Sequence, residues 1–232
     1  MVKLRRILSN RNDLKWIIIS FSIFCIALGL ALQALKSLDS QYPVQYFYIN
    51  YIYFTTHSNI LILVILILQF TRYKKSKIYD IFVHIGLVNI LLTGSVFHLF
   101  LGPYMDVLLV QHLLHTVSPI MYLFFYFFIH DKSFNLLYIE TLFIYPIIYT
   151  FLVYFLIEPK LGNTLELVQG EFQGSRYIYP FFDPFYYEFD SFKMIQFFTF
   201  SVVFIIVVTL LLTQPTKRYI ERKINESHPN EG

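Results

Sequence analysis

Polar side chains that could do chemistry gather at the start of one long apolar stretch. Residues 54–59 supply hydroxyl, imidazole and amide groups in the order Phe54, Thr55, Thr56, His57, Ser58 and Asn59. On a helix, Thr55, Ser58 and Asn59 share one face because they are spaced three and four residues apart. Such groups are costly to bury at membrane depth, so this run is a candidate functional site.

Two later stretches add more groups of the same kinds. Ser95 and His98 lie three residues apart near the end of one stretch. The next stretch begins with a polar group made of Gln111, His112, His115, Thr116 and Ser118. Gln111 and His115 are four residues apart, and His115 and Ser118 are three apart, so they align on one helix face. We therefore expect four imidazoles to meet in one outer cluster: His57, His98, His112 and His115.

Such a cluster supports three kinds of function. A hydroxyl becomes a nucleophile when an imidazole within about 3 Å removes its proton, and Asn59 or His57 would then stabilise the oxyanion. Histidines on neighbouring helices are also ligands for a metal ion or haem. The spacing of His98, His112 and His115 matches no strong ligand motif, however, and lacks the glutamates of a di-iron bundle. The third alternative is a lipid-binding or packing module without catalysis.

Each of these groups also has a structural interpretation. A Ser, Thr or Asn in a membrane helix commonly bonds a backbone carbonyl or a neighbouring helix, and a single buried His is commonly a packing group. Proline in a membrane helix is typical of a kink. Four imidazoles from three segments are harder to explain by packing, so the pattern favours a site.

The composition requires a membrane environment for the elements that hold these groups. Of 232 residues, 56% are hydrophobic and 14% are charged, against about 25% charged residues in a typical globular domain. The single cysteine, Cys25, has no partner for a disulfide. The basic residues form short clusters between apolar runs, which argues against a nucleic-acid-binding domain.

Six apolar runs are long enough to cross a hydrocarbon core, which needs about 20 residues. They cover residues 16–35, 51–71, 81–101, 107–129, 137–157 and 194–213. The sequence thus predicts an all-α membrane protein, a single bundle of six transmembrane helices with an outer lid loop at 158–189 and a tail at 214–232. The polar groups above fall in the outer half of this bundle, and the inner half offers little to match them.

The distribution of Lys and Arg predicts the orientation. Fourteen of the 18 basic residues fall in the N-terminal stretch, the second and fourth connections and the tail. Because positive residues favour the cytoplasmic side, both termini are predicted to be cytoplasmic and the protein to reside in the cell membrane.

Four motifs in this order resemble a known superfamily. They are Tyr53-Phe54-Thr55-x-x-Ser58-Asn59, His115-Thr-Val-Ser-Pro119, Tyr145-Pro146-x-x-Tyr149 and Tyr179-Pro180-Phe181-Phe182-Asp183. Over roughly residues 45–215 the chain resembles the bacterial predicted six-span membrane proteins. It is more distantly similar to the androgen-induced and androgen-dependent membrane proteins of animals, which hydrolyse fatty-acid esters of hydroxy fatty acids with a threonine and a histidine.

The resemblance implies specific roles. The histidine corresponds to His115 and the threonine to Thr55, with the adjacent Thr56 as the alternate nucleophile. The supporting residues would be His57, Ser58, Asn59, His98, His112 and Ser118. The leading hypothesis is therefore a hydrolase that acts on a membrane lipid or fatty-acid ester, without a metal or other cofactor. The alternatives are a non-catalytic lipid-binding protein and, third, a histidine-ligated metal or haem protein.

Overall fold

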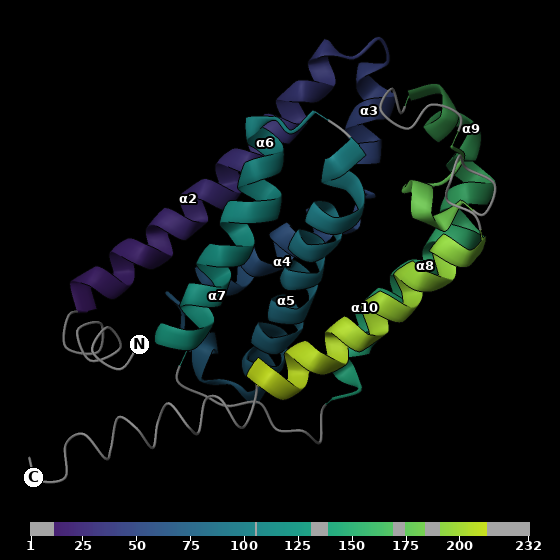
Figure 1. Cartoon of the computed structure of the whole chain (residues 1–232). Coiled ribbons are helices and arrows are strands. Elements are labelled where there is room, and N and C mark those ends of the chain that lie inside the picture. The colour runs from purple at the N-terminus through teal and green to yellow at the C-terminus, as the bar shows by residue number, and fades with distance from the viewer. Residues whose placement is uncertain (1–11, 105, 131–138, 169–174, 184–190, 213–232) are drawn as a thin grey trace, which may run out of the picture.

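The described residues form only helices and their connections. The computed structural model describes residues 12–104, 106–130, 139–168, 175–183 and 191–212 (Figure 1). The basic stretch 1–11, parts of the expected lid loop (169–174 and 184–190) and the tail 214–232 lie outside the described residues.

The longer helices run in alternating directions along the chain (Figure 1). They are α2 (Asn12–Lys36), α4 (Phe54–Leu68), α5 (Lys77–Val96), α7 (Ser118–Phe128), α8 (Thr141–Leu152) and α10 (Ser191–Leu212). Shorter helices are α3 (Pro43–Asn50), α6 (Leu109–His112) and α9 (Glu158–Val168). Tight 3₁₀ turns are η1 (Ser37–Asp39), η2 (Arg72–Lys75), η4 (Gly102–Tyr104) and η8 (Pro180–Phe182). Wider π-helical turns are η3 (Phe97–Leu101), η5 (Leu113–Val117) and η7 (Val153–Ile157). We call the end of the bundle with η2 the basic end and the end with η8 the lid end.

Three helical stretches are long and apolar enough to cross a membrane. They are Asp13–Asp39, Lys77–Leu101 and Thr141–Val168. The pair α3 and α4 gives a fourth candidate with a 60° bend, and α10 contains the shorter apolar segment Ile195–Leu210. The described part of the chain is therefore all-helical, with three to four helices suited to a membrane.

Two of the expected helices have different limits in the structure. The expected run 51–71 is broken near residue 52, and α4 starts at Phe54. The fifth run continues as helix through η7 and α9 to Val168, so the outer segment begins as helix and not as a loop from residue 158. The spacing of the buried residues fits a helix packed on one side: Gly162, Leu165 and Val168 of α9 are buried at intervals of three.

Helix α5 is the central element of the bundle. In the most apolar part of the α5 stretch, 67% of the residues are buried, against 28% in the α2 stretch and 22% in the α8–α9 stretch. One buried apolar cluster joins the basic-end half of α5 to α2, α4 and α7. A second cluster joins its other half to η3, α8, α9, η8 and α10. The first two turns of α4 and the turn η5 lie near the junction of these clusters.

Candidate functional site

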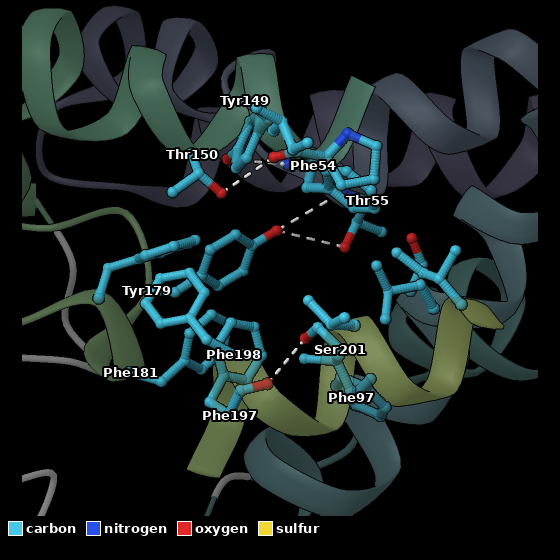
Figure 2. A pocket seen from close by; sticks show the side chains of 18 of the residues that line it. Phe54, Thr55, Phe97, Tyr149, Thr150, Tyr179, Phe181, Phe197, Phe198 and Ser201 are labelled. Carbon is cyan, nitrogen blue, oxygen red and sulfur yellow. Dashed lines mark hydrogen bonds between the residues drawn. The ribbon is translucent and has the colours of Figure 1, made fainter. Parts of the chain in front are cut away.

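An apolar cavity of about 240 Å³ lies between the start of α4, the second half of α5, α8, η8 and α10 (Figure 2). Its walls are mostly aromatic and aliphatic side chains. Polar residues from several segments also line it, among them Thr55, Thr93, His115, Tyr149 and Tyr179. The hydroxyls of Thr150 and Ser201 reach the cavity too, but each donates to a carbonyl of its own helix. A concave, mostly apolar cavity with a few polar groups is typical of a small-molecule binding site.

Thr55 is placed by the way α4 begins. The first N–H groups of a helix lack partners in the helix itself, and here two tyrosine hydroxyls accept from them (Figure 2). The Phe54 N–H donates to the Tyr149 hydroxyl at 3.1 Å, and that hydroxyl donates to the Ile52 carbonyl at 2.9 Å. The Thr55 N–H donates to the Tyr179 hydroxyl at 3.4 Å. The bend before α4 thus puts Thr55 in the first helical turn, at the wall of the cavity.

The hydroxyl of Thr55 contacts Tyr179 as well. The two oxygen atoms lie 3.5 Å apart, and Thr55 is 7% exposed. Burial raises the pKa of the Tyr179 hydroxyl to about 12, and its contacts with Thr55 oppose part of that rise. The phenol therefore stays protonated at neutral pH and remains a hydrogen-bond donor in the site.

His115 is carried by the π-helical turn η5. In a π turn each carbonyl accepts from the residue five positions later, as the Leu113 carbonyl does from the Ser118 N–H. For Leu114 that residue is Pro119, which has no N–H. The Asn59 amide fills the gap: it donates to the Leu114 carbonyl at 3.2 Å and to the Thr55 carbonyl at 2.9 Å. One side chain thus ties the turn that carries His115 to the helix that carries Thr55.

A glycine allows η5 to approach α5 closely. A Cβ atom on Gly94 would lie 2.9 Å from the His115 carbonyl oxygen and 3.1 Å from the Pro119 ring. The His115 imidazole stacks on Phe97 with the ring centres 4.0 Å apart. Its Nδ1 atom is buried and has no hydrogen-bond partner among the described residues. The stack on Phe97 and the close approach to α5 therefore hold the imidazole at the cavity wall.

A second, more polar cavity of about 100 Å³ adjoins the first on the lid-end side of α2. The two cavities share five lining residues: Thr55, Phe97, Leu101, His115 and Tyr179. Polar groups on its other walls are Gln33, Lys36, Asn50 and Gln111. Thr55, His115 and Tyr179 therefore stand at the boundary between an apolar and a polar space.

The expected convergence of four histidines does not occur. His57 bonds Tyr145 on α8 through Nδ1, away from both cavities. His98 is exposed and bonds the Thr116 hydroxyl at 3.0 Å, and His112 is exposed. No group of three or more His, Cys, Asp or Glu suited to a metal ion is found in the part of the chain that the structure describes.

The other expected residues have structural contacts. The Thr56 hydroxyl donates to the Asn50 carbonyl at 2.6 Å and lies 3.3 Å from the Gln33 side-chain oxygen, so it contacts two wall residues of the second cavity without lining either cavity itself. The Ser118 hydroxyl donates to the Leu113 carbonyl at 2.8 Å, within η5. Ser58 is fully buried without lining either cavity. Asn59 bonds two carbonyls, so its amide is not directed at an oxyanion. Of the expected set, the structure brings Thr55 and His115 into one cavity.

The sequence patterns did not identify Thr93 and Tyr179 as members of the site. Thr93 lies one residue before Gly94, and its buried hydroxyl has no hydrogen-bond partner among the described residues. Tyr179 lies in an aromatic run that is typical of a membrane interface. A useful signal was available for Thr93: a Thr-Gly pair on a helix favours close packing against a neighbour.

The basic end also has buried polar groups, contrary to the expectation that the inner half offers little. His84 and His130 are 2% and 5% exposed, and their rings lie 5.8 Å apart. His130 Nε2 lies 4.0 Å from an Asp80 carboxylate oxygen, and Tyr79 bonds Gln69 at 2.5 Å. These groups pack among the apolar residues of α5 and α7, and they belong to the core.

No family model matches the chain, and no curated protein or solved structure matches it.

Proposed function

We propose that this protein is an integral membrane hydrolase of lipid esters, with Thr55 as nucleophile and His115 as general base. The observation that carries the proposal is that Thr55 and His115 line the same two cavities, one apolar and one polar. An ester bond lies at such a boundary in any amphiphilic lipid. The His115 imidazole lines both cavities, so it can act on a group that enters either of them.

The proposed reaction has two steps. The Thr55 oxygen attacks the ester carbonyl carbon while His115 takes the hydroxyl proton. The tetrahedral oxyanion then collapses, the alcohol leaves with the proton from His115, and an acyl-threonine remains. Water activated by the same imidazole attacks this acyl group and releases the fatty acid, which restores the Thr55 hydroxyl.

Two features of the site would stabilise the negative charge. Thr55 lies in the first turn of α4, at the positive end of the helix dipole. The Tyr179 hydroxyl, 3.5 Å from the Thr55 oxygen, is a protonated donor beside the position that the oxyanion takes. Tyr179 thus replaces Asn59 and His57 as the proposed oxyanion donor.

The proposal includes six membrane spans with both termini in the cytoplasm of a cell-membrane protein. It is supported by the placement of fourteen of the 18 basic residues on one side and by the alternating direction of the long helices (Figure 1). The basic end is then cytoplasmic and the site opens in the outer half. A cysteine introduced at Gly170 should react with an impermeant thiol reagent applied from outside, whereas one at Ser76 should not.

A non-catalytic lipid-binding protein is the second candidate. It is favoured by the contact of the Thr55 hydroxyl with Tyr179, because a hydroxyl in use as a nucleophile is expected to bond the base.

Hydrolysis of a long-chain fluorogenic fatty ester by purified protein distinguishes the hydrolase from the non-catalytic lipid-binding protein. Thr55→Ala, His115→Ala and the double variant should each lose activity by at least about 100-fold and to the same extent, because nucleophile and base act as a unit. The matched control is Thr56→Ala. The wild-type Thr56 hydroxyl donates to the Asn50 carbonyl, so its removal should leave activity unchanged. Thr93→Val removes a second threonine hydroxyl from the cavity wall and should retain activity.

Equal activity in wild type and Thr55→Ala, or no activity on any long-chain ester, would exclude the hydrolase. Loss confined to Thr93→Val or to Thr56→Ala would move the nucleophile to that residue.

A further inference from the structure

The apolar cavity reaches the outer surface between α8 and α10. Both helices pack on α5, and both supply cavity walls. Three of the lining residues are also strongly exposed on the outside of the bundle: Ile147 at 51%, Phe151 at 59% and Val202 at 49%. A side chain that lines a cavity and also faces outward marks the rim of an opening. These strongly exposed rim residues are all apolar, as expected for an opening toward lipid chains.

The wall opposite this opening leads to the polar cavity. The residues at the boundary are Thr55, His115 and Tyr179, together with Phe97 and Leu101. Beyond it, the amide groups of Gln33 and Asn50 bond each other, while Gln111 supplies an amide N–H and Lys36 supplies an ammonium group. None of the described residues that line this cavity is acidic. Its walls therefore suit a polar group that carries hydrogen-bond acceptor oxygens.

We propose that the two cavities form one passage for a single-chain amphiphile, which enters between α8 and α10 and lies across Thr55. Its aliphatic chain occupies the apolar cavity, and its polar end, rich in acceptor oxygens, lies toward Lys36 and Gln111. Only the cleavage of a bond at Thr55 rests on the proposed function. The entry and the orientation of the amphiphile do not. The passage itself follows from the shared walls of the two cavities.

Neighbouring residues on both rim helices provide matched controls. Val202 lines the cavity and Val203 does not, although they are 49% and 52% exposed. Ile147 lines it and Ile148 does not, at 51% and 49% exposed. A tryptophan at Val202 or Ile147 fills the opening, whereas one at Val203 or Ile148 adds the same bulk to the lipid-facing surface.

The test is photolabelling of Thr55→Ala protein in lipid nanodiscs, with a fatty acid that carries a mid-chain diazirine. We expect the label on cavity-lining residues of α8 and α10, identified by mass spectrometry. Val202→Trp and Ile147→Trp should reduce it at least about tenfold, and Val203→Trp and Ile148→Trp should not. Lys36→Met should weaken labelling by the acid more than labelling by the corresponding long-chain alcohol.

Equal labelling in the Val202→Trp and Val203→Trp proteins, or label confined to residues outside the cavity, would overturn the passage. Because Thr55→Ala protein is used, the result is independent of hydrolysis. Expected labelling with an inactive wild type would exclude the hydrolase and keep the passage. If the wild type hydrolyses esters and all variants are labelled equally, the passage is excluded and the hydrolase is kept.

Discussion

His84 and His115 occupy opposite halves of the bundle, one on α5 near its start and the other on η5 beside the last turns of α5. The Nδ1 atom of His84 lies 2.5 Å from the Asp80 carbonyl oxygen on its own helix, and its ring packs against Tyr126. His115 stacks on Phe97 and lines two cavities. His84 is buried, whereas His115 is half-buried and borders a space that a ligand can fill. Contact with such a space separates a candidate base from a histidine that only packs in the core.

The largest expected effect concerns these two histidines. His115→Ala should lower ester hydrolysis by at least about 100-fold with little change in thermal stability, since it enlarges an existing cavity. His84→Ala should do the opposite: it removes a packed, hydrogen-bonded core group at a cost of about 1–3 kcal/mol and leaves the activity of folded protein unchanged. Hydrolysis rates and thermal unfolding in detergent measure both. If His84→Ala abolished hydrolysis in folded protein, it would be wrong to assign the catalytic site to the half with His115 and a packing role to His84.

Two glycines give the next contrast. A methyl group at Gly94 meets a backbone oxygen, that of His115, at 2.9 Å, so η5 must move away from α5. At Gly86 it meets the flexible end of Ile65 at 2.8 Å and the Tyr122 hydroxyl at 3.0 Å. We expect Gly94→Ala to cost about 1–3 kcal/mol and to lower hydrolysis severalfold, whereas Gly86→Ala costs less and keeps activity. Unchanged activity in Gly94→Ala protein would show that the site does not depend on this close approach.

Two buried asparagines give the smallest contrast. Asn59 donates to two carbonyls, while neither amide atom of Asn89 has a hydrogen-bond partner among the described residues. Asn59→Leu should destabilise the protein by about 1 kcal/mol or somewhat more and reduce activity, because it strands the Leu114 carbonyl. Asn89→Leu should be neutral or stabilising, because it removes an unsatisfied buried amide. Chemical or thermal unfolding of the two variants decides the sign, and loss of stability in Asn89→Leu would mean that its amide has a partner.

The position of His57 shows what helix periodicity could predict from the sequence. His57 is two residues from Thr55 and from Asn59, and residues two apart on a helix do not face each other. Its separation from the cavity was therefore available from the sequence. For His112 and His115 the same reasoning fails, because the π turn η5 adds a residue to the helical repeat and turns His112 to the surface.

The sequence by itself determined that the chain is helical, that long apolar segments form it, and that hydroxyl, amide and imidazole groups share the start of α4 and the region around η5. Those features depend on composition and on spacing along one helix. Only the tertiary structure decided which groups meet. It brought Tyr179 to Thr55 from 124 residues away, and it joined Asn59 to Leu114 across the bundle. Such contacts depend on how one helix is rotated against another, and that rotation is fixed by packing at α5 and not by any local pattern.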